Sequence, residues 1–273
     1  MDQGAPVAVT DTLPLAVPDV EEVRRDARAA LDAVTAAARR LDDPTAPGGL
    51  AGPSALPGWS RSHVLAHVTA IGEAMARQAE VAARGGLAEV YDGGAAGREA
   101  GIQAGARRSV AEHVAALEAL AGRLDAAWPA AGSPDWAARV TYRDGTVVDA
   151  LVAWWREVRV HAVDLDAGIG LASWTPALGH HLLDFLGVRL ADDVTVELAG
   201  EPDRLVVGPG GLRRPDAPGV VVVRGALVDV AAWLAGRSPG TDPVALRAGE
   251  PVALPPIGPW PSPYSRPAAD ARA

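Results

Sequence analysis

Three residues suited to metal binding or proton transfer follow one another at helical spacing in the second half of the chain. Glu157, His161 and Asp164 lie in the stretch WWREVRVHAVD, whose other residues are typical of a helix. At about 3.6 residues per turn, Glu157 and His161 project from one face, and Asp164 follows on that face one turn later. The stretch is apolar enough to be buried, and buried polar groups need partners. A divalent metal would be such a partner.

A third ligand must come from another part of the chain, and the segment LPGWSRSHVLAHV contains the best candidate. Ser60 is suited to a helix N-cap, and apolar residues recur at helical spacing after it. His67 borders this apolar stripe and should face the core, whereas His63 lies one turn earlier, near the exposed start of the helix. A site made of His67, Glu157 and His161, with positions left open, has the ligand count of catalytic rather than structural zinc.

The same residues also have ordinary explanations. Glu157 could pair with Arg156 or Arg159 on a solvated helix face, and His67 could be a hydrogen-bonded histidine of the core. An E-x-x-x-H pair is common by accident, and no local feature shows that the two segments meet. The spacing alone therefore leaves a metal site and a structural role both open.

Three motifs together resemble one known family. They are LPGWSxxxVLAHV around His67, REVxVHxVDL at residues 156–165, and RG followed by WLAGR at residues 224–225 and 233–237. In this order they resemble the mycothiol-dependent maleylpyruvate isomerases, over about residues 20–255. The resemblance implies an α+β protein, in which an N-terminal DinB-like four-helix bundle that binds a metal precedes a small, sterol-carrier-like α/β domain.

The resemblance also implies a reaction. A divalent metal on His67, Glu157 and His161, for which zinc is best suited, would lower the pKa of the thiol of mycothiol. The thiolate would add to the electron-poor double bond of maleylpyruvate, the new single bond would rotate, and loss of the thiolate would leave fumarylpyruvate. The metal could equally polarise a substrate oxygen, and nickel, cobalt or manganese would suit the same ligands.

Further site residues are implied by the same resemblance. A dicarboxylate substrate calls for arginine, and Arg98 and Arg237 match basic positions of the family pocket. Together with Asp164 they are the expected catalytic residues, while Arg98, Asp164 and Arg224 are expected to bind the cofactor, with Arg224 as a substitute for Arg237. Asp164 could instead orient one of the two histidines. An arginine that ends a helix also favours the helix dipole without any ligand.

Composition argues against several other functions. The chain has 273 residues, a net charge of −9 and no basic stripe with aromatic platforms, so we expect no nucleic-acid partner. It contains no cysteine, so any thiol chemistry needs an external thiol. Its sequence has no glycine-rich phosphate loop between a strand and a helix and no G-x-S-x-G elbow, which disfavours nucleotide and serine-hydrolase chemistry.

Composition also bears on source and location. All 25 basic residues are arginine, a bias typical of GC-rich genomes such as those of actinobacteria, which make mycothiol. The first residues lack the pattern of a signal peptide, and no apolar run reaches the ~18 residues that span a membrane. We therefore expect a cytoplasmic protein without a membrane partner, as a monomer or small homo-oligomer.

The apolar patterns divide the chain into four parts. These are a flexible arm (1–18), the helical bundle (19–170), the α/β domain (171–250) and a Pro-rich tail (251–273). The tail is expected to be extended or disordered, or to drape over the bundle with Trp260 and Tyr264 as anchors.

Individual elements are predicted within these parts. The bundle should contain four helices, a Gly-rich connection at 91–105 and a short hairpin at 138–148 before its last helix. The α/β domain should contain helices at about 176–190 and 227–234, and strands at 194–198, 205–208 and 220–223. Elsewhere, His113 is expected to be solvated, and His180 and His181 to be surface or interface residues.

Two other functions remain open at this stage. The chain could be a mycothiol S-transferase that acts on a different small-molecule electrophile, in detoxification or natural-product biosynthesis. It could also be a non-catalytic binding protein whose second domain holds an apolar ligand. A binding protein would not need the three metal-binding side chains.

Overall fold

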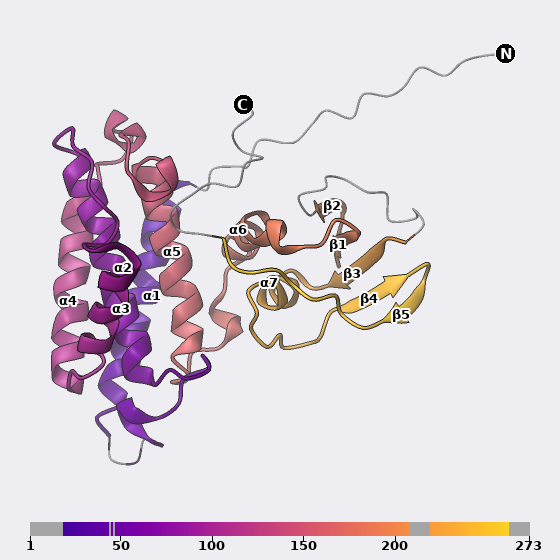
Figure 1. Ribbon diagram of the computed structural model, residues 1–273, viewed down its shortest axis with the longest axis horizontal. Coiled ribbons are helices and arrows are strands. Elements are labelled where there is room, and N and C mark those ends of the chain that lie inside the picture. Colours follow the sequence, from indigo (N-terminus) through magenta and orange to yellow (C-terminus); the bar gives the residue numbers. More distant parts are fainter. Residues whose placement is uncertain (1–18, 44, 46, 208–218, 262–273) are drawn as a thin grey trace.

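The computed structural model describes residues 19–43, 45, 47–207 and 219–261. A helical bundle lies beside a smaller unit of helices and a sheet (Figure 1). The expected α+β class is confirmed. The predicted arm at 1–18 and Tyr264 lie outside the described residues, and the exact domain boundaries stay predictions.

Four long helices form the bundle, as expected. They are α1 (Val20–Arg40), α2 (Arg61–Ala82), α4 (Val110–Ala127) and α5 (Val147–Asp164). Helices α1 and α2 each pack against both α4 and α5, so the apolar faces of all four meet in one core. Large side chains that are fully buried there include Leu31, Leu65, Leu117, Leu151 and Trp154.

Capping residues set where these helices begin. The Asp19 carboxylate accepts hydrogen bonds from two backbone N–H groups in the first turn of α1. The hydroxyl of Ser60 accepts from the backbone N–H of His63 at the start of α2, as predicted. Ser109 and Glu112 form a reciprocal capping box at the start of α4, which was also predicted.

Two predictions for the bundle are wrong. The Gly-rich connection contains a further helix, α3 (Gly94–Gly105), which packs against α2. The predicted hairpin at 138–148 is absent from the described structure of that segment, where one isolated bridge joins Arg139 to Thr146 around a 3₁₀ turn (Tyr142–Asp144). Thr146 caps α5, so the residues expected as the second strand already belong to that helix.

The second unit contains α6 (Pro176–Leu186), α7 (Leu227–Leu234) and a five-stranded sheet in the order β2-β1-β3-β4-β5. The strands are β1 (Val194–Leu198), β2 (Glu201–Val207), β3 (Val221–Gly225), β4 (Val244–Arg247) and β5 (Glu250–Val252). Strands β1 and β3 are parallel and the other pairs antiparallel. Helices α6 and α7 lie on the side of the sheet that faces the bundle (Figure 1).

The sequence predicted three of these strands and both helices, but missed β4 and β5. Strand β5 crosses the expected boundary at residue 250, so the Pro-rich part begins inside the sheet. Helix α6 ends at Leu186 and is followed by a 3₁₀ turn, η5 (Gly187–Arg189), rather than continuing to 190. None of the described helices combines the length and the apolar character that crossing a bilayer requires.

Candidate metal centre

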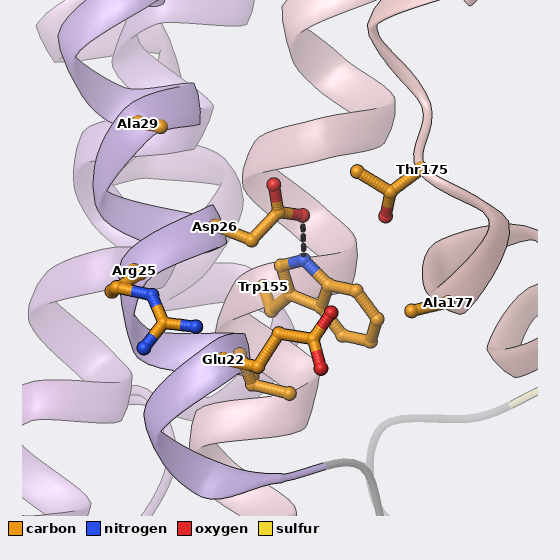
Figure 2. Close-up of a pocket in the computed structure, with 8 residues that line it drawn as sticks. Glu22, Arg25, Asp26, Ala29, Trp155, Thr175 and Ala177 are labelled. Atoms are coloured by element: carbon orange, nitrogen blue, oxygen red, sulfur yellow. Dashed lines mark hydrogen bonds between the residues drawn. The ribbon is translucent and has the colours of Figure 1, made fainter.

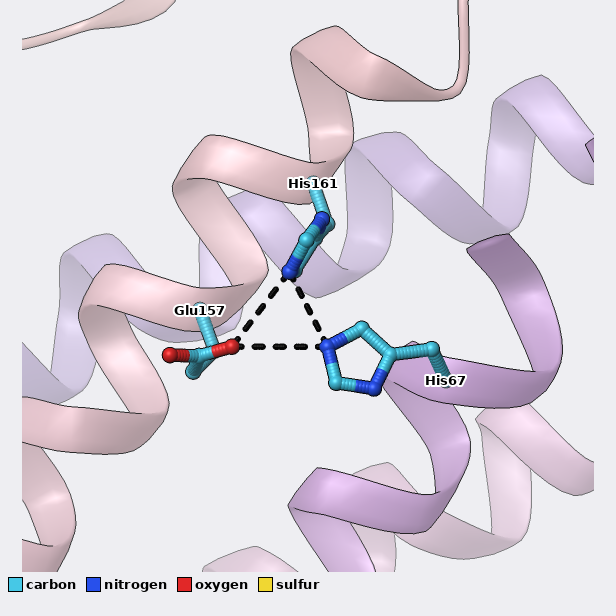
Figure 3. A group of neighbouring side chains, drawn as sticks. All are labelled: His67, Glu157 and His161. Atoms are coloured by element: carbon cyan, nitrogen blue, oxygen red, sulfur yellow. Dashed lines mark hydrogen bonds and ion pairs between the residues drawn. The ribbon is translucent and has the colours of Figure 1, made fainter. Parts of the chain in front are cut away.

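Helices α2 and α5 bring together the three side chains that were predicted as metal ligands. His67 Nε2 lies 3.0 Å from His161 Nε2 and 3.4 Å from Glu157 Oε2. His161 Nε2 lies 3.3 Å from the same carboxylate oxygen. Figure 3 shows the two rings and the carboxylate pointing toward one another. One nitrogen or oxygen atom from each residue is therefore available at a shared point.

Close helix packing explains why these distant segments meet. His67 is only 3% exposed, because α2 contacts α3, α4 and α5. Gly72 permits this approach: a Cβ there would lie 2.6 Å from Leu120 Cδ2 and 3.0 Å from the Trp154 ring. The prediction that His67 faces the core is confirmed.

The charge states of the three residues are set by burial and by one another. Burial, and next the charge of His161, lower the pKa of His67 to about 4 and keep it neutral. Burial alone would raise the pKa of Glu157, but hydrogen bonds from His161 and His67 hold it well below its usual range. Burial would lower the pKa of His161, but hydrogen bonds to Asp164 and Glu157 raise it instead. Neutral imidazole and ionised carboxylate are the forms that bind metals.

Asp164 and Arg237 support the α5 side of the centre. Asp164 is fully buried, and its Oδ2 lies 2.8 Å from His161 Nδ1. Arg237 donates from Nε to Asp164 Oδ1 at 3.0 Å and from Nη2 to Oδ2 at 2.6 Å. Burial alone would raise the pKa of Asp164, but hydrogen bonds from His161 and Arg237 lower it. Of the three roles considered for Asp164, which were catalysis, cofactor binding and orientation of a histidine, the geometry matches the last.

The end of α7 determines where Arg237 lies. Gly236 adopts a positive φ of 71°, and the backbone N–H of Arg237 donates to Ala232 O at 2.9 Å, a glycine-based helix ending. Arg237 Nη1 also donates to Ala235 O, so it satisfies a helix-end carbonyl as well as Asp164. Through this side chain the second unit reaches the site.

The α2 side has a different surrounding. Arg98, on α3, places Nη2 3.3 Å from His67 Nδ1, and its guanidinium lies 6.0 Å from the Tyr91 ring. The Trp59 ring lies edge-on to His67, with 5.6 Å between ring centroids. Arg98 is thus brought to the centre, as predicted. Its helix was missed, since glycine-rich segments rarely indicate one.

Arg224 does not join this group through any of the described contacts. It donates from Nε to Glu197 on the neighbouring strand β1, and its side chain is 53% exposed. The arrangement is typical of a cross-strand ion pair at a sheet surface. The basic residue that reaches the centre from the second unit is Arg237.

The alternative partners for Glu157 are also accounted for. Arg156 Nη2 lies 3.8 Å from Glu157 Oε1, so this weak pairing accompanies the contacts with the histidines. Arg159 is occupied by Asp26 on α1. A separate hollow of about 230 Å³ is lined by Asp26 and Trp155 (Figure 2). Its half-buried acid, Asp26, already accepts hydrogen bonds from Trp155 and Arg159, so the hollow is less suited to chemistry.

Two further histidines have structural positions. The expectation that His113 is solvated is wrong: it is fully buried, and its Nε2 lies 2.8 Å from Ser62 Oγ, which also donates to Ala106 O at 2.7 Å. Ser62, on α2, thus joins His113 to Ala106 at the end of α3. His181 lies between α5 and α6, with Nε2 3.3 Å from Arg156 Nη1, consistent with the predicted interface position.

Comparison with protein families matches residues 27–166, more than half of the chain, to the mycothiol maleylpyruvate isomerase N-terminal domain. Crystal structures of the mycothiol-dependent maleylpyruvate isomerase and of a histidine-to-alanine mutant have the same fold, with TM-scores of 0.73 and 0.72. Each is 22% identical in sequence and covers 88% of this chain and 97% of its own. A search of curated proteins gives no match. The chain belongs to the mycothiol maleylpyruvate isomerase family, a family of enzymes.

Proposed function

We propose that this chain catalyses a mycothiol-dependent, metal-assisted cis–trans isomerisation of maleylpyruvate type. The observation that carries the proposal is the convergence of His67, Glu157 and His161 on one point between α2 and α5. Family membership supports the same reaction. The absence of cysteine is consistent with it, since the thiol must then come from outside the chain.

The donor set fits a divalent metal. Two imidazole nitrogens and one carboxylate oxygen lie 3.0–3.4 Å apart, and the His67 ring is neutral. A proton shared by the two imidazole rings would satisfy fewer of the lone pairs on these three atoms than a metal cation bound to all of them. Two histidines, one glutamate and open positions are typical of catalytic zinc. When bound, the metal would supply a Lewis acid that favours the thiolate form of a thiol or polarises a substrate oxygen.

Asp164 gives His161 the tautomer that a metal ligand needs. Its carboxylate accepts a hydrogen bond from Nδ1 of His161 at 2.8 Å, so a metal that displaces the Nε2 proton would meet the Nε2 lone pair at the shared point. Arg237 in turn neutralises Asp164 through two hydrogen bonds. The second unit therefore contributes to the centre by fixing the orientation of a ligand.

Arg98 is placed to exchange His67 for a substrate group when a metal binds to the centre. Here it donates to Nδ1 of His67. A histidine that binds a metal through Nε2 carries its proton on Nδ1, so Nδ1 becomes a donor. Two donors cannot hydrogen-bond, and Arg98 would be free to bind a carboxylate group of the substrate.

The test is an assay of cis-to-trans maleylpyruvate isomerisation, with and without mycothiol, on protein whose metal content is known from elemental analysis. We expect about one metal per chain and turnover that requires both the metal and the thiol. Glu157→Gln should lose both metal and turnover.

Each of the other outcomes assigns the chain differently. Bound metal without isomerisation would indicate a mycothiol S-transferase acting on another electrophile. Full turnover in metal-free protein would refute metal assistance. If the protein shows neither isomerase nor S-transferase activity, and if Glu157→Gln binds a ligand as the wild type does, the chain is a binding protein.

A further inference from the structure

After β5 the chain continues as a segment, residues 253–261, that we call the strap. It runs from the sheet back over α7 toward α6 and the bundle (Figure 1). Ile257 and Trp260 in the strap are partly buried and pack against the core. A Cβ on Gly236 would lie 3.9 Å from Ile257 Cδ1, so the strap contacts the turn that immediately precedes Arg237.

Arg189 fixes the strap in this position. The backbone carbonyl of Arg189 accepts a hydrogen bond from Gly258 N at 2.8 Å. The side-chain Nε of Arg189 donates to Gly258 O at 2.7 Å. Its Nη1 donates to Leu234 O at the end of α7. One buried arginine thus joins η5, the strap and the helix from whose end Arg237 projects.

Trp260 lies beside both arginines. Its ring centroid is 5.4 Å from Arg237 Cζ and 5.4 Å from Arg189 Cζ, and the Phe185 ring lies 6.2 Å from it. Burial, and then the charge of Arg237, lower the pKa of Arg189, because like charges repel each other. An indole face attracts cations and can offset that repulsion.

We propose that the strap sets the geometry of the metal centre from outside it, with Trp260 as a positioning residue that holds the Arg237 guanidinium on Asp164. The bidentate contact requires the planar guanidinium and the carboxylate to stay aligned. The indole limits rotation of the guanidinium toward solvent. Asp164 in turn orients His161, so Trp260 acts through two intermediate side chains.

The consequence for turnover rests on the proposed function, but the effect on Arg237 does not. The test therefore reads the Arg237 side chain directly. In ¹⁵N NMR spectra, the Nε–H resonance that disappears in Arg237→Lys identifies this group. In the wild type it should exchange slowly with water, because it is bonded to a fully buried carboxylate.

Trp260→Leu keeps apolar bulk but removes the ring, and we expect Arg237 Nε–H exchange to become about tenfold faster. Trp260→Phe, which keeps a ring, should stay within about threefold of the wild type. Trp233→Leu is the matched control, because Trp233 is also a partly buried indole of the second unit. It should leave the Arg237 signal unchanged. Melting temperatures establish that each variant is folded.

With maleylpyruvate and mycothiol, Trp260→Leu should lower kcat/KM about tenfold, and by less than twofold when Arg237 is already lysine. Unchanged Arg237 exchange in Trp260→Leu would overturn the proposal, whatever the turnover. Equal losses of kcat/KM in both backgrounds would also overturn it, since Trp260 would then act independently of Arg237. If the exchange changes as expected but wild-type protein has no turnover, the proposed function fails and the positioning role stands.

Discussion

The two halves of the metal centre are supported in different ways. On the α5 side, His161 is bonded to a buried carboxylate, which is bonded to an arginine from the second unit. On the α2 side, His67 is neutral, and its Nδ1 has an arginine as partner instead of a carboxylate. One half is held by a carboxylate–guanidinium network, and the other by packing and by the hydrogen bonds of a neutral histidine.

This difference indicates which half can respond to ligands. A charged, bidentate network fixes the orientation of its members before anything binds. The α2 half lacks such a network among its described contacts, and its arginine lies on α3, a glycine-rich helix. We therefore expect the α5 half to be fixed in advance and the α2 and α3 half to adjust to metal and substrate.

The largest expected effect comes from removing a ligand of the fixed half. Glu157→Gln should lose stoichiometric metal and lower kcat/KM about a thousandfold or more, since the amide lacks the charge that binds the cation. Elemental analysis and the isomerase assay measure both. His63→Ala is the control: His63 lies one turn before His67 but serves the N-terminal cap of α2. A Glu157→Gln protein that keeps its metal would remove the basis for the comparison.

Asp164→Asn should break the network while leaving the ligands in place. Metal affinity should fall about 10- to 100-fold, because His161 loses the carboxylate that orients it. The unfolding free energy should also fall by about 3 kcal/mol, because Arg237 is left partly buried without its counter-charge. Chelator competition and urea unfolding measure the two effects. If affinity is unchanged, the network is structural only.

The sequence could predict the fixed half well because helical spacing alone places its residues. Glu157, His161 and Asp164 share a face of any helix that contains them, and the apolar stripe beside His67 required it to face inward. Family resemblance supplied the pairing of these two helices. The contact between Arg237 and Asp164 was not foreseen, since it joins two units that no periodic pattern connects.

The adjustable half was harder to predict for a physical reason. Helix α3 forms in a glycine-rich segment of weak helix propensity, and packing against α2 compensates for that weakness. His113 was expected to be solvated from its place near the start of a capped helix, yet it is buried and contacts Ser62 on α2. Trp260 supports the fixed half instead, and it was expected only as a possible anchor of a Pro-rich segment, because no local pattern shows what such a segment contacts. All three depend on contacts between segments far apart in the chain.

Acid should lower the unfolding free energy of the metal-free protein through His113, which lies on α4 and contacts Ser62 on α2. Burial, and next the charge of Arg108, lower the pKa of His113 to about 4, from 6.5. Below pH 6.5 the unfolded chain binds a proton that the folded chain excludes, so stability is lost as pH falls from 6.5 toward 4. The loss at pH 5 is about 2 kcal/mol for this group. Urea unfolding in chelator, at pH 7.5 and pH 5, measures it.

His113→Gln isolates this contribution, because His113 is not one of the three metal ligands. The substitution has its own cost, but the drop in unfolding free energy between the two pH values should shrink by about 2 kcal/mol. The same pH dependence in both proteins would show that His113 is not the group responsible.

Arg98→Gln should separate substrate binding from metal binding. Loss of the guanidinium should raise KM about tenfold, since a substrate carboxylate loses a charged partner. Metal affinity should stay within about threefold, because Arg98 is not a ligand and its contact with His67 is incompatible with the metal-bound tautomer. A large loss of metal affinity would show that Arg98 supports the ligand itself, and that the two halves are more alike than their hydrogen bonds indicate.

The smallest expected effect comes from moving α3 as a whole. A Cβ on Gly105 would lie 2.8 Å from the Cβ of Ala66, the residue before His67. Both atoms are fixed to helix backbones, so Gly105→Ala must push α3 away from α2 by a few tenths of an ångström. This should cost about 1–2 kcal/mol of stability, and KM should rise only severalfold, because Arg98 is carried two turns away on the same helix.

Gly101→Ala provides the matched control in the same helix. A Cβ at this position meets no atom within 4 Å, so the substitution adds only helix propensity. It should stabilise the protein by about 0.5–1 kcal/mol and leave KM unchanged. Opposite signs of the two stability changes would show that the contact between Gly105 and Ala66, rather than glycine content, sets the position of α3. If the two alanine substitutions raise KM equally, the position of Arg98 depends on the flexibility of α3 instead. The adjustable half would then respond to ligands through bending of this helix.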